Sequence, residues 1–128
     1  MTIRRSIDIE DEVRIALTDY LTVYCRPLPE NHTLPNILVT QVGGADQDSQ
    51  VDTFDIVLDA RAKSAAEANE TLRNAVAILR KVAGEQSTAI RYVTVNSSGS
   101  WGSDPVRPDL AMYSARLRVV AHLETITI

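Results

Sequence analysis

The longest regular pattern in this sequence is a strict alternation of side chains over residues 111–124. One set of alternate positions is almost entirely apolar and comprises Ala111, Tyr113, Ala115, Leu117, Val119, Ala121 and Leu123. The positions between them are mostly polar and comprise Met112, Ser114, Arg116, Arg118, Val120, His122 and Glu124. A period of two is typical of a strand with one buried face, and this run exceeds the usual length of about five or six residues. We therefore expect a long strand that either bends or extends past its own sheet to meet a neighbour.

Two earlier runs predict a β-hairpin. Residues 37–42 are compact and β-prone, and they end at Gly43-Gly44. From Val51 the chain alternates again, with Phe54, Ile56, Leu58 and Ala60 pointing to one side. Such alternation is typical of a half-buried antiparallel strand. The polar residues between the two runs predict a flexible loop at about 43–50.

A fourth strand is expected over residues 89–96, and a short β-prone segment lies at 22–25. The residues after 96 are rich in Ser, Gly, Pro and Asp. This composition favours turns and loops, so we expect a second flexible loop over about 97–109.

The first helix is predicted from its acids and its spacing. Asp8 is a plausible N-cap, and three acids follow in the first turn, where the helix dipole favours negative charge. An apolar stripe then recurs at helical spacing, made of Ile9, Val13, Ala16/Leu17, Tyr20 and Leu21. One side of this helix is therefore expected to face a core.

The second helix has the clearest local pattern in the chain. Ser64 and Glu67 stand at the spacing of a capping box, in which two side chains bond to first-turn N–H groups. An apolar stripe follows, made of Ala65, Ala68, Leu72, Val76, Leu79 and Val82/Ala83. Arg80 and Lys81 stand in the last turn and Gly84 at the expected C′ position.

The predicted order is α–β–β–α–β–β in one domain, 1–128. Antiparallel strands with two helices packed on one face form an α+β two-layer sandwich. A length of 128 residues fits one such domain with an adequate core.

Composition disfavours several classes of protein. The net charge is −4 and no Lys/Arg cluster is present, which disfavours a free DNA-binding role. No apolar run approaches the roughly 20 residues of a membrane span, and no signal peptide is recognisable. The single cysteine cannot form an internal disulfide.

The charge is unevenly divided along the chain. Residues 1–60 contain four basic and eleven acidic residues, whereas residues 61–128 contain nine basic and six acidic residues. Opposite signs on different faces would suit head-to-tail packing of identical subunits. The alternative is that a solvated helix and an acidic loop happen to fall in one half.

The sequence contains no recognisable catalytic, cofactor-binding or metal-binding motif. His32 and His122 have no ligand at metal spacing, and Cys25 has no CxxC partner, so solvated histidines and a core cysteine are favoured. A Cys–His nucleophile pair remains an alternative that no motif supports. Asp46, Asp48 and Asp52 lack the glycine and glutamate of a calcium loop. We therefore expect no enzyme activity, no cofactor and no metal.

Contact surfaces are the remaining candidates for function. Trp101 is the only tryptophan, and Arg107 is its natural companion in the same segment. Buried Trp and Arg commonly dominate binding energy, although Trp101 could instead cap the core of its own domain. The outward face of the last strand, with Met112, Arg116 and Arg118, is a second candidate partner-binding surface.

The whole pattern resembles the tail terminator (tail completion) proteins of long-tailed bacteriophages and prophages. The stretches that carry the resemblance are LPNILVTQVGG, DTFDIVLDARAKSAAEANETLRNAVAILRKV and the closing RLRVVAHLE. The most telling part is Phe54 to Val82, where a strand runs through a capping box into a helix. The resemblance covers nearly the full chain and rests on order, length and character, with no invariant motif.

The resemblance implies a homo-oligomeric ring, usually a hexamer, at the head-proximal end of the virion tail, assembled in the host bacterial cytoplasm. Such a ring ends tail-tube polymerisation and offers a surface to the head connector or neck protein. Family members have no catalytic residues, and DNA only passes through the lumen. By position, residues 43–50 and 97–109 would face the lumen or adjacent rings, and Asp46, Asp48 and Asp52 would let DNA slide through.

Two alternatives stay open. Another neck or connector-completion protein would share the size and fold type. A small α+β ligand-binding module or enzyme with an unrecognised pocket belongs to a different class.

Overall fold

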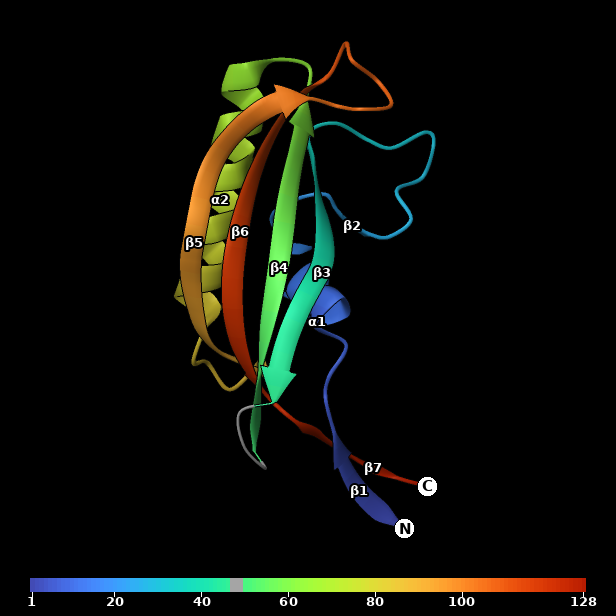
Figure 1. The fold of residues 1–128 in the computed structure, drawn as a ribbon, viewed down its shortest axis with the longest axis vertical. Helices are drawn as coiled ribbons and strands as arrows, with labels where there is room; N and C mark the ends of the chain where they lie inside the picture. Colours follow the sequence, from blue (N-terminus) through green and yellow to red (C-terminus); the bar gives the residue numbers. More distant parts are fainter. Residues whose placement is uncertain (47–49) are drawn as a thin grey trace.

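A computed structural model describes residues 1–46 and 50–128, apart from the side chains of Ala45, Asp46 and Ser98. The elements in chain order are β1 (Thr2–Arg5), α1 (Ile9–Leu17), β2 (Val23–Cys25), β3 (Asn36–Asp46), β4 (Val51–Ala62), α2 (Ala65–Val82), β5 (Ile90–Ser103), β6 (Ala111–His122) and β7 (Glu124–Thr127). Five of these strands form one sheet in the order β2-β3-β4-β6-β5, while β1 and β7 pair separately as a two-stranded ribbon. The ribbon extends beyond one end of the sheet (Figure 1).

The centre of the sheet is the antiparallel pair β4–β6. Their register is continuous from Val51 opposite His122 to Ala62 opposite Ala111. The alternation of both strands places their apolar residues on one common face, and this face is fully buried: Ile56, Leu58, Ala60, Leu117, Val119 and Ala121. The predicted inward sides of these two strands are confirmed over these positions.

Both helices pack on this buried face, as Figure 1 shows for α2 behind the sheet. Helix α2 contacts β4, β5 and β6, and α1 contacts β2 and β3. Leu72 and Leu79 of α2 and Val13 and Leu17 of α1 lie in the same core cluster as the strand residues. The α+β sandwich of two layers is therefore confirmed.

The ends of α2 follow the sequence pattern. The Ser64 side chain accepts a hydrogen bond from the Glu67 backbone N–H, as an N-cap does. After the helix, Gly84 has φ +89°, a conformation that glycine adopts without steric cost. Arg80 and Lys81 lie in the last turn, where the helix dipole favours positive charge.

Helix α1 is shorter than expected. Asp8 caps it as predicted, but the helix ends at Leu17 and residues 18–20 form a turn. Tyr20, assigned to the buried stripe, is 67% exposed, so that assignment is wrong. Leu21, the last residue of the predicted stripe, packs against the core as expected, although it lies after the turn that ends the helix.

Both loop predictions are too long. Strand β3 runs to Asp46 because residues Gly43–Asp46 pair with Asp52–Asp55 after a bulge at Gln41/Gly43. Gly44 is required in this close approach, since a Cβ there would lie 2.7 Å from the Thr53 carbonyl oxygen. Likewise β5 runs to Ser103, although its pairing with β6 is interrupted by register shifts. The expected loops at 43–50 and 97–109 are therefore wrong over 43–46 and 97–103.

Three short strands change the predicted order. The β-prone segment at 22–25 contains β2, which pairs parallel to β3, so the sheet is not purely antiparallel. The long final alternation is interrupted after His122, where the chain leaves the sheet and continues as β7 against β1. The predicted order α–β–β–α–β–β therefore omits three strands, β1, β2 and β7. Only β2 was indicated by the sequence, as the β-prone segment at 22–25.

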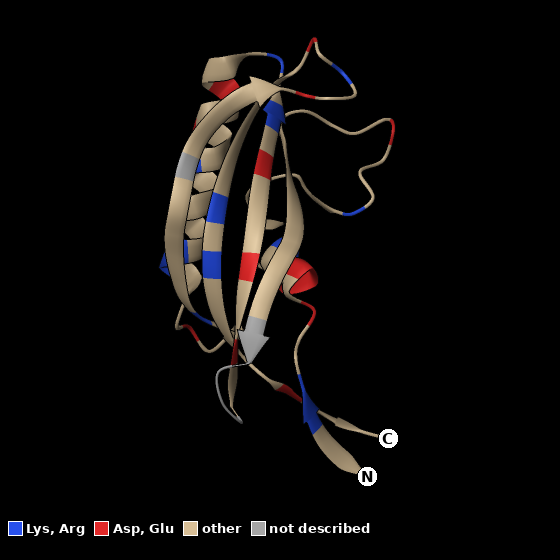
Figure 2. Ribbon diagram, in the orientation of Figure 1, with Lys and Arg blue, Asp and Glu red and all other residues tan. Residues whose placement is uncertain are grey.

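No helix or strand covers the opposite face of the sheet among the described residues, although Asp104 packs against Arg61 at one end of it. This face carries the intervening side chains of β4 and β6, including Asp55, Asp59, Arg116 and Arg118. Figure 2 shows the acidic positions of β4 beside the basic positions of β6. We call this surface the open face.

The one-sided core gives a first prediction. Leu117→Ala on the covered face should reduce the free energy of unfolding by about 2–5 kcal/mol, because it leaves a cavity in a fully buried site. Val120→Ala on the half-buried open face should cost about 1 kcal/mol or less. Urea unfolding of the two variants measures both values, and equal losses would show that the open face is packed as tightly as the core.

Candidate interaction surfaces

The open face combines charged pairs with an exposed arginine. Arg118 Nε donates to Asp55 Oδ1 at 3.0 Å, and Ser114 Oγ donates to Asp59 Oδ1 at 2.5 Å. Arg116 is exposed between these pairs, and Met112 is half-buried farther along β6. The structure therefore brings Met112, Arg116 and Arg118 onto one surface, as the alternation predicts.

Trp101 lies elsewhere. It belongs to edge strand β5 and is paired with Tyr113, whose side chain packs against the core from the helix side of the sheet. The indole therefore stands on the helix side, on the opposite face from Met112 and the two arginines. It is 62% exposed, so the alternative that it caps the core of its own domain is wrong.

A buried ion pair anchors the segment between β5 and β6. Arg61 Nε donates to Asp104 Oδ2 at 2.7 Å, and both side chains are more than nine-tenths buried. The second carboxylate oxygen, Oδ1, accepts the backbone N–H groups of Val106 and Arg107. Asp104 thus ties the 104–110 segment to β4.

The pKa of Asp104 follows from these contacts. Burial by itself raises the pKa, but hydrogen bonds from Val106 N–H, the Arg61 guanidinium and Arg107 N–H lower it below its usual value. No expectation drawn from the sequence included this pair. The only local pattern that could have indicated it is Asp104 before Pro105, which is typical of a turn closed by the Asp side chain.

Arg107 lies in the segment between β5 and β6, where its side chain makes an exposed ion pair. Its guanidinium pairs with Asp109 at 2.9 Å in the same exposed segment, and both side chains are more than half exposed. Such a pair adds little stability, at most about 1 kcal/mol. Arg107 is therefore exposed and paired with Asp109 in this segment.

The acidic residues assigned to a lumen loop have different environments. Asp52 is buried in β4 and accepts a hydrogen bond from Ser6 Oγ, so its expected place in a solvated loop is wrong. Asp46 is the last residue of β3, and its side chain is outside the description. Asp48 lies outside the described residues.

Among the described residues, Cys25 makes no hydrogen bond with either histidine. Burial, followed by the negative charge of Glu10, raises the pKa of the Cys25 thiol, which opposes formation of a nucleophilic thiolate. Its Sγ lies 3.4 Å from the Glu10 carbonyl oxygen. His32 contacts the Asn36 amide at 2.8 Å, and His122 lies at the far end of β6. Within residues 1–46 and 50–128, no three His, Cys, Asp or Glu side chains are grouped to hold a metal.

The β1–β7 ribbon has an apolar side. Ile3 pairs with Ile126, so their side chains share one side of the ribbon. Ile128 N–H donates to the Met1 carbonyl oxygen, and the side chains of Met1 and Ile128 are mostly exposed. An ion pair between Arg5 and Glu124 closes the ribbon near the body.

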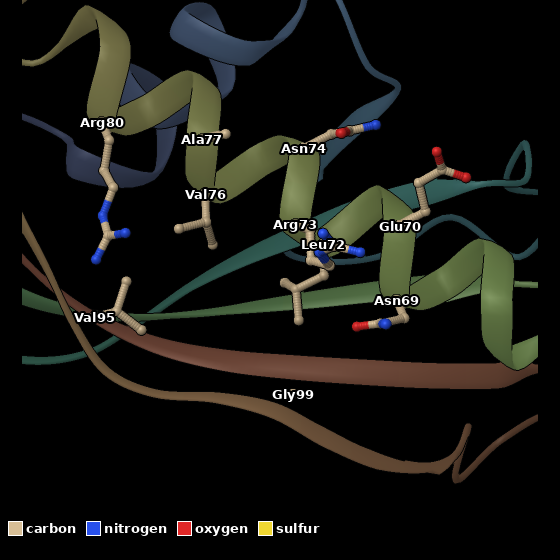
Figure 3. Close-up of a pocket in the computed structure, with 10 residues that line it drawn as sticks. All are labelled: Asn69, Glu70, Leu72, Arg73, Asn74, Val76, Ala77, Arg80, Val95 and Gly99. Atoms are coloured by element: carbon tan, nitrogen blue, oxygen red, sulfur yellow. The ribbon is translucent and has the colours of Figure 1, made fainter.

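A groove of about 680 Å³ lies between α2 and β5. Its apolar lining is Leu72, Val76, Ala77 and Val95, and its polar lining includes Glu70, Arg73 and Arg80. Figure 3 shows Val76 and Leu72 directed from α2 toward β5, where Val95 and Gly99 lie. We call this hollow the α2–β5 groove.

No protein-family model matches this chain, and a search of curated proteins finds no match. No described helix has the length and apolar composition that crossing a bilayer requires.

The buried ion pair gives a second prediction. Asp104→Ala should lower the free energy of unfolding at neutral pH by about 3–5 kcal/mol, because Arg61 keeps a buried charge without its partner. Since the folded pKa of Asp104 is depressed, the native contribution is present above the unfolded pKa and is lost as pH falls through the folded pKa. The deficit of the variant should therefore shrink in acid.

Asp109→Ala is the matched control, because it breaks an exposed pair in the same segment. Its cost should stay within about 1 kcal/mol at any pH. Urea unfolding across a pH series compares the two variants. A pH-independent deficit for Asp104→Ala would contradict the assignment of the ion pair.

Proposed function

We propose that this protein is a structural phage protein whose copies form a ring of six at the head-proximal end of the tail tube. The ring ends tube polymerisation and provides the surface to which the head connector or neck protein binds. DNA passes through the lumen. The observation that carries the proposal is the exposure, in a single chain, of large side chains that subunit contacts normally bury.

Edge strand β5 carries the main exposed aromatic residues. Tyr92 is 71% exposed on the open-face side, and Trp101 is 62% exposed on the helix side. A long exposed edge strand is a template for pairing with another chain, and Trp and Tyr are enriched at interface centres. Both features support a protein that works by contact with its neighbours.

The ribbon supports the same conclusion. A two-stranded antiparallel pair is marginally stable by itself in water. The β1–β7 ribbon nevertheless leaves the body of the domain and presents Ile3 and Ile126 on one side. Packing against another subunit would bury this side and stabilise the ribbon.

The specific role as tail terminator comes from the resemblance of the strand-to-helix unit at 54–82 to that family. In the structure this unit is β4 followed directly by α2, the two elements around which the sheet and core are organised. Another neck or connector-completion protein would require similar contact surfaces. The effect on tube growth distinguishes the two roles.

A tube-growth assay tests the role. Tail-tube protein from the same particle should polymerise into tubes of unlimited length by itself and into short tubes of limited length when this protein is added. Electron microscopy measures the tube lengths. Unchanged tube length at saturating concentrations of this protein would exclude the tail terminator role and favour the connector-completion alternative.

Trp101→Ala gives a third prediction. The variant should keep the free energy of unfolding of the isolated chain within about 0.5 kcal/mol, because the indole is mostly exposed. It should weaken self-assembly or tube capping at least about tenfold, the effect of losing an interface anchor of roughly 1.4 kcal/mol or more.

Val106→Ala is the matched control, since Val106 is 87% exposed in the segment after β5 and is not aromatic. It should leave both assembly and stability unchanged. Sedimentation across a dilution series compares the variants. Equal behaviour of Trp101→Ala and native protein would remove Trp101 from the contact surface.

A further inference from the structure

The α2–β5 groove has an apolar floor and a basic rim. Val76, Ala77 and Val95 form the accessible floor, while Leu72, also in the lining, is only 2% exposed and belongs to the core. Arg73 and Arg80 stand on the rim, about 10 Å apart along the helix axis. Neither makes an ion pair with another described residue, although Glu70 lies one turn before Arg73. The groove therefore offers apolar surface between two available positive charges.

A second surface has the opposite character. It lies where α1 meets the C-terminal end of α2, and a smaller hollow there is lined by residues that include Ile15, Asp19, Tyr20 and Glu85. Ile15 is 52% exposed and Tyr20 is 67% exposed. We call these four residues the acidic patch.

The carboxylates of the acidic patch make no ion pair among the described residues, although the nearby Arg91 guanidinium donates to the backbone carbonyl oxygens of Glu85 and Thr88. No ion pair of Asp19 or Glu85 occurs within the described residues. A third acid in the same hollow, Glu12, is already engaged, since it accepts hydrogen bonds from Thr88 Oγ1 and Ala89 N–H at 2.9 Å each. Asp19 and Glu85 are therefore the carboxylates available to a partner.

The two surfaces lie on different sides of α2. Arg80 lines the groove and Val82 lines the hollow of the acidic patch. Residues at positions i and i+2 of an α-helix are rotated by about 200° relative to each other around its axis. The side chains of Arg80 and Val82 therefore point in nearly opposite directions. Helix α1 covers the β2–β3 side of the sheet, whereas the groove lies on the β5 side. One molecule therefore cannot bring its own acidic patch into its own groove.

We propose that the α2–β5 groove binds the acidic patch of a second copy of this chain. Ile15 and Tyr20 of one copy pack on the apolar floor, and Asp19 and Glu85 pair with Arg73 and Arg80 of the other. The charges are complementary and exposed apolar side chains meet an apolar hollow. The contact deepens the proposed ring and rests on it, because it specifies which surfaces join adjacent subunits.

Such a contact is head-to-tail. Each subunit uses two different surfaces, so every copy can give its acidic patch to one neighbour and receive that of another in its groove. A contact of this type closes into a ring if the rotation between subunits is suitable, and otherwise forms a filament.

Charge reversal with rescue tests the contact. The variant R73E/R80E places negative charge in the groove, and the variant D19R/E85R places positive charge in the patch. Each should weaken self-assembly at least about tenfold, because like charges then face each other. The variant with all four substitutions restores opposite charges and should assemble with an affinity within about threefold of the native protein. Light scattering on a dilution series measures each affinity.

Lys63→Glu combined with Lys81→Glu is the matched control. It changes the net charge as much as R73E/R80E, and neither lysine lines the groove or the patch hollow. This variant should assemble as the native protein does. Circular dichroism and thermal unfolding confirm that every variant is folded.

Cross-linking provides an independent measurement if a reversed variant fails to fold. In a Cys25→Ser background, copies with Ala77→Cys are mixed with copies carrying Ile15→Cys. The two cysteines should form an interchain disulfide under mild oxidation. Thr94→Cys, exposed on the open face, replaces Ile15→Cys in the control and should give none.

The outcomes separate this contact from the proposed function. If the native protein assembles but the four-substitution variant is not rescued and the Ala77–Ile15 pair does not cross-link, this contact is wrong and the ring proposal stands. If the native protein stays monomeric with and without tail-tube protein, both are wrong. Rescue together with cross-linking supports the contact.

Discussion

The fold depends on the packing of α2 across β4 and β6. Leu72 and Leu79 of the helix share a core with Leu58 and Leu117 of the two central strands, and all four are essentially inaccessible to water. The apolar area that these side chains remove from water is the main stabilising contribution, at roughly 25 cal/mol per Å². Every other element is positioned relative to this layer: α1 over β2 and β3, and β5 along the outer edge of β6.

A core of this kind uses only one face of the sheet. The alternate side chains of β4 and β6 must therefore face away from the helices, and they are satisfied by cross-strand pairs such as Arg118 with Asp55. Strand β5 is an edge of this sheet, paired only with β6, and the chain ends pair with each other in a separate ribbon. Tyr92 is exposed because no helix or strand covers the open face among the described residues, whereas Trp101 is exposed on the helix side of edge strand β5.

The sequence predicted the parts of the fold that local patterns determine. Asp8, Ser64 and Gly84 mark helix ends through capping chemistry, and the alternation at 111–121 identified the buried side of β6. Strand extension at Gly43–Asp46 and Ser97–Ser103 was missed, because glycine and serine favour loops locally whereas pairing with β4 and β6 decided the outcome. The predicted apolar stripe of α1 also continued too far, because helical spacing persists to Leu21 although the helix ends at Leu17.

The candidate surfaces were predicted in part. Met112, Arg116 and Arg118 share a face because alternation alone fixes it. The α2–β5 groove and the Arg61–Asp104 pair could not be predicted, since each joins segments that are distant in the sequence. The prediction that Asp52 lies in a solvated loop was wrong. Asp52 is buried and accepts a hydrogen bond from Ser6 Oγ, which is 46 residues earlier in the chain. Long-range partners of this kind leave no local pattern.

The central claim is that this protein acts by joining copies of itself through surfaces that a single chain leaves exposed. Native mass spectrometry of the purified protein, alone and with tail-tube protein, tests the claim most directly. It should find one closed particle of six chains that persists on moderate dilution. A single chain as the only species at every concentration, with or without tail-tube protein, would contradict it.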